Sequence, residues 1–137
     1  HPDITISTDV IVGFPTETYE EFMESVKLIT DTKPDVLNFS KYWPRPGTEA
    51  AELKPIDGDA MKERTAKIKE VFDEGALENN KRWLGWEGEI LIDEEGKNGT
   101  LVGRNYAYRP IILKGKFKIG DSVKVKIKKA TTRDLRA

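Results

Sequence analysis

The sequence predicts an α/β segment followed by a small all-β module. Two observations support this division. A short apolar run, a helical pattern and a second apolar run follow one another in the first third of the chain, and short alternating segments separated by glycines follow Trp83. Between them lies a long amphipathic pattern that is typical of one helix. We therefore expect two domains, residues 1–82 and residues 83–137.

The first half has the order strand, helix, strand and loop, which is that of a right-handed βαβ unit. Residues 10–12 are a continuous apolar run bounded by Gly13. Such a run favours a strand that is buried on both faces of a parallel sheet. Residues 36–42 form the second extended run, and a Pro-rich loop follows it.

Two helices are predicted from their caps and their apolar spacing. Thr18 and Glu21 fit the capping-box pattern, in which a hydroxyl and a carboxylate bond the first free amides of a helix. The apolar positions that follow at helical spacing are Phe22, Val26 and Ile29. A longer helix begins at Asp59, which we expect to cap it. Its apolar face is predicted to consist of Met61, Thr65, Ile68, Phe72, Ala76, Asn79 and Trp83.

Four short strands are predicted after Trp83. They are Glu89 to Asp93, Thr100 to Arg104, Pro110 to Leu113, and Ser122 to Lys128. In the last of these the apolar side chains alternate with lysines, so burial of the apolar row places three ammonium groups on the opposite surface. The apolar row is Val123, Val125 and Ile127, and the lysines are Lys124, Lys126 and Lys128. About 55 residues are enough only for a small barrel or meander.

Composition excludes several classes of site. The 137 residues include one His and no Cys, which excludes disulfides, a cysteine nucleophile, a thiolate zinc site and an iron–sulfur cluster held by this chain. No apolar run approaches the roughly 20 residues of a membrane-spanning helix. We therefore expect no membrane association and a cytoplasmic location. We also expect no metal site and no catalytic residue within this chain.

The charges are distributed unevenly along the chain. The formal net charge is −1, but residues 1–96 carry 11 Lys+Arg against 22 Asp+Glu, and residues 97–137 carry 12 Lys+Arg against 2 Asp+Glu. The basic end predicts a polyanionic partner such as nucleic acid. The alternative is chance patterning on a solvated face.

The first candidate site lies where the two predicted strands end, because ligands of α/β sheets bind beyond the carboxyl ends of the strands. Glu17 follows the first strand, and it is either a ligand contact or a first-turn residue favoured by the helix dipole. Asp9, an acid in a strand predicted to be buried, is either a site residue or half of a structural ion pair. The loop at residues 42–48 either presents Arg45 to a carboxylate or phosphate or is a structural turn.

The second candidate site lies in the basic module. Two arginines and two tyrosines fall within six residues, namely Arg104, Tyr106, Tyr108 and Arg109, and three alternating lysines follow, namely Lys114, Lys116 and Lys118. Guanidinium groups pair with phosphates and exposed rings stack on unpaired bases, a combination that favours RNA. The alternatives are that the tyrosines pack inside the barrel and that the lysines are a solubilising edge.

Three separated segments resemble those of one family. Residues 8–18 read TDVIVGFPTET, residues 42–48 read YWPRPGT, and the last third contains NGTLVGR at 98–104 and IGDSVKVKI at 119–127. In this order they resemble the radical S-adenosylmethionine methylthiotransferases that carry a C-terminal TRAM domain. The segment around residues 41–42 is similar to the archaeal and eukaryotic branch, which acts on N6-threonylcarbamoyladenosine next to the anticodon of tRNA.

The resemblance implies a fold and a larger enzyme. Residues 1–82 would be the last βαβ unit of a radical SAM partial TIM-type barrel with a connecting helix, and residues 83–137 an OB-like TRAM barrel. In such enzymes one S-adenosylmethionine is cleaved to a radical and another methylates the inserted sulfur. Two 4Fe-4S clusters would be held by a missing N-terminal part, so this chain alone would be inactive.

The resemblance also implies roles for individual residues. Those facing S-adenosylmethionine would be Ile11, Gly13, Glu17, Tyr42, Pro44 and Arg45. Those binding the tRNA anticodon stem-loop would be Lys97, Gly103, Arg104, Tyr106, Arg109, Lys124 and Lys126. The competing functions are a non-catalytic RNA-binding adaptor and a methylthiotransferase that acts on a ribosomal protein. Because half a barrel leaves open strand edges, we also expect the isolated chain to form a homo-oligomer or a swapped dimer.

Overall fold

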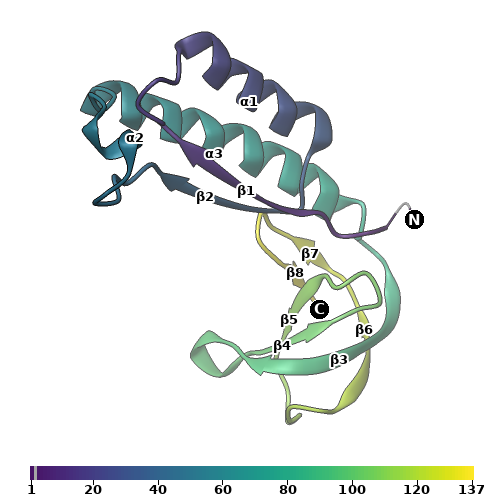
Figure 1. Cartoon of the computed structure of the whole chain (residues 1–137). Coiled ribbons are helices and arrows are strands. Elements are labelled where there is room, and N and C mark those ends of the chain that lie inside the picture. Colours follow the sequence, from purple (N-terminus) through teal and green to yellow (C-terminus); the bar gives the residue numbers. More distant parts are fainter. Residues whose placement is uncertain (2) are drawn as a thin grey trace. The chain divides into compact units, whose positions relative to one another are not determined.

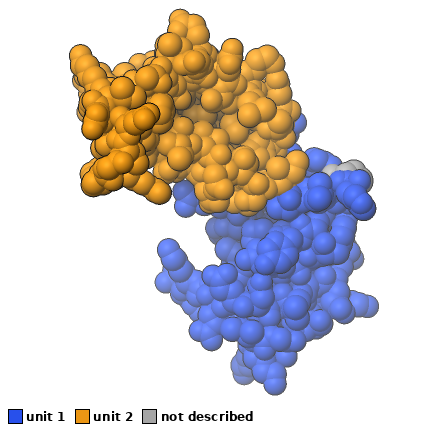
Figure 2. Space-filling view, viewed as in Figure 1, with its two compact units in different colours: residues 1–5, 76–137 blue, residues 6–75 orange. Residues whose placement is uncertain are grey.

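The chain folds into two compact units in a computed structural model that describes residue 1 and residues 3–137. One unit consists of residues 6–75, and the other combines residues 1–5 with residues 76–137 (Figure 2). The break between them falls inside one helix, at Gly75 and Ala76. It lies upstream of the boundary that we predicted at residue 82.

The first unit places two parallel strands against two helices (Figure 1). Strand β1 (Ser7–Val12) leads through α1 (Tyr19–Thr32) to β2 (Val36–Lys41), and Val12 lies opposite Lys41, so both strands end at the same level. The short α2 (Glu49–Glu52) and the long α3 (Gly58–Lys81) follow. The predicted strand–helix–strand order is confirmed.

Helix α1 begins as the sequence predicts. The Thr18 hydroxyl accepts the N–H of Glu21 at 3.2 Å, and the Glu21 carboxylate accepts the N–H of Thr18 at 2.8 Å, which completes the capping box. Lys33, in the left-handed conformation, ends the helix. The buried face of α1 joins both strands and α3 in one core, formed by Val12, Phe22, Val26, Ile29, Leu37 and Ile68.

Two expectations about this unit are wrong. Asp57, not Asp59, caps α3, because the Asp57 carboxylate accepts the N–H groups of Asp59 at 2.9 Å and Ala60 at 3.3 Å. Strand β1 is buried on one face only: Val12 is 1% exposed, whereas Ile11 is 62% exposed. The helices cover a single face of the two-stranded sheet, so Asp9 is an exposed residue of the open face and needs no buried partner.

The second unit is a curled six-stranded sheet, and its shape fits a small β-barrel (Figure 1). The strands, in their order across the sheet, are β6 (Ser122–Lys126), β3 (Glu87–Glu95), β4 (Leu101–Arg104), β5 (Pro110–Leu113), β8 (Leu135–Arg136) and β7 (Lys129–Ala130). The four predicted strands are present, and β7 and β8 are additional. A 3₁₀ turn, η1 (Lys97–Gly99), joins β3 to β4. The core inside the curl consists of Trp83, Ile90, Ile92, Ala107, Ile111, Leu113, Ile127 and Leu135.

The predicted alternation at β6 is confirmed. Ile127 is buried, Val123 and Val125 are half-buried, and the three intervening lysines are exposed. None of the described helices combines the length and apolar character needed to span a bilayer. Nor do the described residues bring together a group of metal-ligating side chains.

Candidate ligand crevice and nucleic-acid interface

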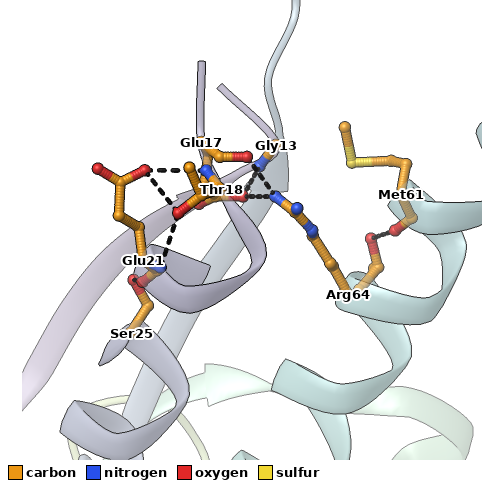
Figure 3. A network of polar contacts seen from close by, with 8 residues as sticks. Gly13, Glu17, Thr18, Glu21, Ser25, Met61 and Arg64 are labelled. Carbon is orange, nitrogen blue, oxygen red and sulfur yellow. Dashed lines mark hydrogen bonds and ion pairs between the residues drawn. The ribbon is translucent and has the colours of Figure 1, made fainter. Parts of the chain in front are cut away.

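A buried ion pair holds the turn that follows β1 (Figure 3). The Glu17 carboxylate accepts the N–H of Gly13 at 3.0 Å and bonds the Arg64 guanidinium at 2.5 Å. Arg64 also donates to the main-chain carbonyl of Glu17 at 3.1 Å. The Arg64 side chain is 9% exposed and the Glu17 side chain is 13% exposed. The Glu17 carboxylate is therefore engaged in fixing this turn, and its predicted contact with a cofactor stays a prediction.

Gly13 is required by the geometry of the same turn. Its φ of 82° lies in the left-handed region, and a Cβ at this position would lie 2.0 Å from Cε of Met61 on α3. The close approach that glycine permits here is thus to a side chain of this chain. That Gly13 also permits the close approach of a cofactor stays a prediction.

A hollow of about 490 Å³ lies on the open side of the two-stranded sheet, beside the strand ends. Its walls include three of the six residues predicted to face a cofactor, Ile11, Tyr42 and Arg45. The Tyr42 N–H bonds the carbonyl of Val12 at 2.8 Å, and its ring packs edge-on against Phe14 at 5.3 Å between centroids. Pro44 is exposed and is not part of this lining. The hollow combines an apolar wall, a phenol and a guanidinium, which suits a small ligand with a flat apolar part and an anionic group.

Arg64 was not predicted from the sequence. It comes from α3, 47 residues after its partner, and reaches the turn after β1 (Figure 3). The sequence contained one signal for Arg64. It directly precedes Thr65, which belongs to the predicted apolar face of the long helix, and a cation beside a row of buried side chains needs an anionic partner.

Two of the predicted RNA contacts lie inside the β-module and are not surface residues. Arg109 is 5% exposed, and its guanidinium donates to the side-chain oxygen of Asn80 at 3.4 Å and lies 5.9 Å from the ring centre of Trp83. Gly103 is buried, and a Cβ there would lie 2.7 Å from Cδ1 of Ile90. Both residues stabilise the module from within, so they are removed from the exposed RNA surface expected from the sequence.

Arg104 is partly buried and paired with acids of its own module. Its Nε donates to the Asp93 carboxylate at 2.7 Å, and its Nη2 lies 3.8 Å from the Glu94 carboxylate. Asp93 is the extra residue of a β-bulge, because Ile92 pairs with Gly103 and Glu94 pairs with Val102, the residue directly before Gly103. These carboxylates compensate the Arg104 charge locally, which weakens the expectation that it contacts phosphate.

Lysines supply most of the uncompensated positive charge of the module. Among its described residues, the exposed cations that make no ion pair are Lys81, Arg82, Lys97, Lys114, Lys116, Lys118, Lys124, Lys128, Lys129 and Arg133. Lys126 differs, because it bonds the Glu87 carboxylate at 2.6 Å, and this contact lowers the pKa of Glu87. Residues 81–137 together carry 14 Lys+Arg against 7 Asp+Glu, a net charge of +7. The acidic strand β3 thus offsets part of the excess counted for residues 97–137.

Tyr106 and Tyr108 are both largely exposed, so neither packs in the core. The Tyr106 hydroxyl donates to the Asp3 carboxylate at 2.8 Å, and this bond raises the pKa of Tyr106. Its ring lies 5.8 Å from that of Trp83. The Tyr108 ring lies 4.6 Å from the Arg104 guanidinium. The module therefore presents exposed aromatic rings as well as unpaired lysines, the two features that the RNA hypothesis requires.

Residues 81–137 match the TRAM domain. Over 92% of its length the chain is 46% identical to an Archaeoglobus fulgidus protein named probable threonylcarbamoyladenosine tRNA methylthiotransferase. The chain matches the TRAM-bearing part of the methylthiotransferases. A Pyrococcus abyssi protein of the same name is 39% identical over 96% of the chain. A Bacillus cereus protein named tRNA-2-methylthio-N(6)-dimethylallyladenosine synthase is 37% identical, also over 96% of the chain. The chain spans 29%, 31% and 26% of these three relatives, respectively.

Proposed function

We propose that this chain is the tRNA-binding and substrate-positioning part of a longer tRNA methylthiotransferase. The target would be N6-threonylcarbamoyladenosine next to the anticodon, which would become its 2-methylthio derivative. One observation carries the proposal: similarity to archaeal proteins named for this activity extends across both compact units. The location would be the cytoplasm, where tRNA is modified.

The hollow beside β1 and β2 would bind S-adenosylmethionine. Ile11 would lie against the adenine, Tyr42 would form a second wall, and Arg45 would pair with the carboxylate of the methionine part. When bound, S-adenosylmethionine supplies the radical and the methyl group of the reaction. Glu17 and Arg64 would act indirectly, because they hold the turn that ends β1.

The iron–sulfur clusters would be held outside this chain. The sequence contains no cysteine, and the described residues form no other cluster of metal-ligating side chains. The two free edges of the β1–β2 sheet would then pair with the remaining strands of a partial barrel, and the open face, which carries Ile11, would line the interior of that barrel. Isolated, the chain is expected to associate through these open strand edges, and light scattering that reports only monomer would contradict that expectation.

The TRAM domain would bind the anticodon stem-loop through its unpaired lysines. Ammonium groups neutralise phosphates and release counterions, so this contact is largely independent of sequence. Lys97 and Lys124 are the predicted contacts that remain exposed and free of ion pairs among the described residues. Lys126 would contribute less while Glu87 holds it.

Mass spectrometry of tRNA nucleosides tests the proposal. Cells that lack the full-length gene should lose the methylthio group from threonylcarbamoyladenosine, and the wild-type gene should restore it. A full-length gene carrying Lys97→Gln and Lys124→Gln should restore it only partly, because phosphate contacts are lost. Lys54→Gln, which removes an exposed lysine from the other unit, is the matched control and should restore it fully.

The same measurement separates the competing functions. Unchanged tRNA nucleosides in the deletion strain would contradict the proposal and support a non-catalytic adaptor. Unchanged nucleosides together with loss of a methylthio group from a ribosomal protein would support the third function. The names of these relatives favour tRNA as the substrate.

A further inference from the structure

Tyr108 combines an exposed ring with an unusual backbone. It is 66% exposed, and its φ of 63° lies in the left-handed region, which a bulky side chain rarely adopts. Glycine or asparagine would fit this backbone at lower conformational cost. A large aromatic residue that gains little by burial and is held in a costly conformation needs another explanation, and function is one.

Hydrogen bonds to the buried Asn105 fix the segment around Tyr108. Asn105 is buried, and its side-chain oxygen accepts the N–H groups of Ala107 at 3.1 Å and Arg109 at 3.0 Å. The N–H of Tyr108 bonds the carbonyl of Asn105 at 2.9 Å. Because Ala107 and Arg109 are buried on either side, the ring of Tyr108 is displayed on a rigid turn rather than on a mobile loop.

Arg104 stacks on this ring and is itself held in place. Its guanidinium carbon lies 4.6 Å from the ring centre of Tyr108, while Asp93 and Glu94 hold the guanidinium from β3. Because Tyr108 stays 66% exposed, most of its ring is accessible beside this contact. The arrangement fixes the orientation of the ring and adds no free positive charge.

We propose that Tyr108, oriented by Arg104, is a stacking platform for an unpaired RNA base. The inference rests on the proposed function, because it assumes that the module binds RNA, and it names the structural class recognised: a base that is not in a helix. A flat, rigid and exposed ring suits the face of a base, and stacking is tolerant of base identity. The same module also carries unpaired lysines, which suit the phosphates of an RNA ligand.

The test uses the full 137-residue chain with two RNA hairpins of identical stem. One has a normal loop, and the other has abasic sugars in place of the loop nucleotides. Tyr108→Gly removes the ring and relieves the backbone, so its thermal unfolding temperature should not fall. Tyr108→Asn is a second ringless variant compatible with the left-handed backbone. Tyr108→Phe keeps the ring without the hydroxyl.

Both ringless variants should bind the normal hairpin about tenfold more weakly than wild type, the loss expected for one base–aromatic stack. They should bind the abasic hairpin as wild type does, because that probe has no loop base to stack. Tyr108→Phe should match wild type on both probes. The salt dependence should be the same for all four proteins, since no phosphate contact changes.

Two failures are distinguishable. If wild type does not bind the normal hairpin, the proposed RNA-binding function is wrong. If wild type binds it and the ringless variants bind equally well, or lose the same affinity for the abasic hairpin, the function stands and the stacking platform is wrong.

Discussion

The two units each contain an arginine–carboxylate pair, and the pairs lie at different depths. Glu17 and Arg64 are nearly enclosed, and the hydrogen bonds that they make hold the turn after β1. Asp93 and Arg104 lie on the outer side of the β-module, and Arg104 also touches an exposed ring. The same chemical pair therefore fixes a backbone in one unit and orients a surface side chain in the other.

Depth decides what each pair contributes. A buried carboxylate that loses its partner keeps the full cost of desolvation, so the inner pair is a structural requirement of its turn. The Asp93–Arg104 pair is only partly buried, so water screens it more and it contributes less to folding. The Asp93–Arg104 pair can therefore serve binding at little cost in stability, whereas the Glu17–Arg64 pair is required for folding.

Breaking the inner pair should give the largest effect. Arg64→Met leaves the Glu17 carboxylate buried without its charge partner, and we expect a loss of about 3 kcal/mol in the free energy of unfolding. Chemical denaturation measures this loss. The double variant Arg64→Met with Glu17→Gln should recover part of it, because no unpaired charge is then buried. An Arg64→Met protein as stable as wild type would contradict the structural role of the pair.

The glycine of the same turn offers a matched comparison. Gly13→Ala should destabilise the fold by slightly more than the roughly 1 kcal/mol cost of a positive φ, because its Cβ also displaces the flexible end of the Met61 side chain. Gly47 has a similar φ of 80° but no neighbour within 4 Å of its missing Cβ. Gly47→Ala should therefore cost only about 1 kcal/mol. Equal losses by denaturation would show that the Met61 contact is unimportant.

Removing the outer pair should affect stability far less. Asp93→Asn combined with Arg104→Gln keeps the local net charge, and we expect the free energy of unfolding to change by less than about 1 kcal/mol. The slope of RNA affinity against salt should also stay unchanged, because Arg104 is already compensated. If the slope instead became shallower by the amount expected for one phosphate contact, Arg104 would contact the RNA backbone.

The exposed pair of Glu87 and Lys126 gives the smallest effect, which is confined to the titration of Glu87. Hydrogen bonding to Lys126 lowers the pKa of Glu87 in the folded protein. The associated stability is present above the unfolded pKa and disappears as pH falls through the lowered folded pKa. NMR titration of the Glu87 carboxyl should show its pKa rising toward the ordinary value in Lys126→Gln. No change on substitution would exclude this contact in solution.

Local signals in the sequence predicted the elements well. The capping box at Thr18 and the alternation along β6 each depend on residues a few positions apart, and both are confirmed. The cap of α3 was misplaced by two residues because Asp57 and Asp59 offer the same chemistry. Strands β7 and β8 have two residues each, too few to show a period. They pair with each other, and β8 also pairs with the distant strand β5.

The candidate sites were harder to predict because they depend on contacts between distant residues. The partner of Glu17 is 47 residues away, and Arg109 is buried by Asn80 and Trp83, which precede it by more than 25 residues. A count of charges along the chain cannot reveal such pairing. It correctly indicated a basic module but assigned its acidic strand β3 to the other half.

The most direct test is the affinity of the chain for a tRNA anticodon stem-loop at several salt concentrations. If about five lysine–phosphate contacts form, the logarithm of the affinity should fall against the logarithm of salt with a slope near −4. Lys124→Gln should make the slope shallower by about one contact. An affinity that does not change with salt would contradict a lysine-based RNA interface on the β-module.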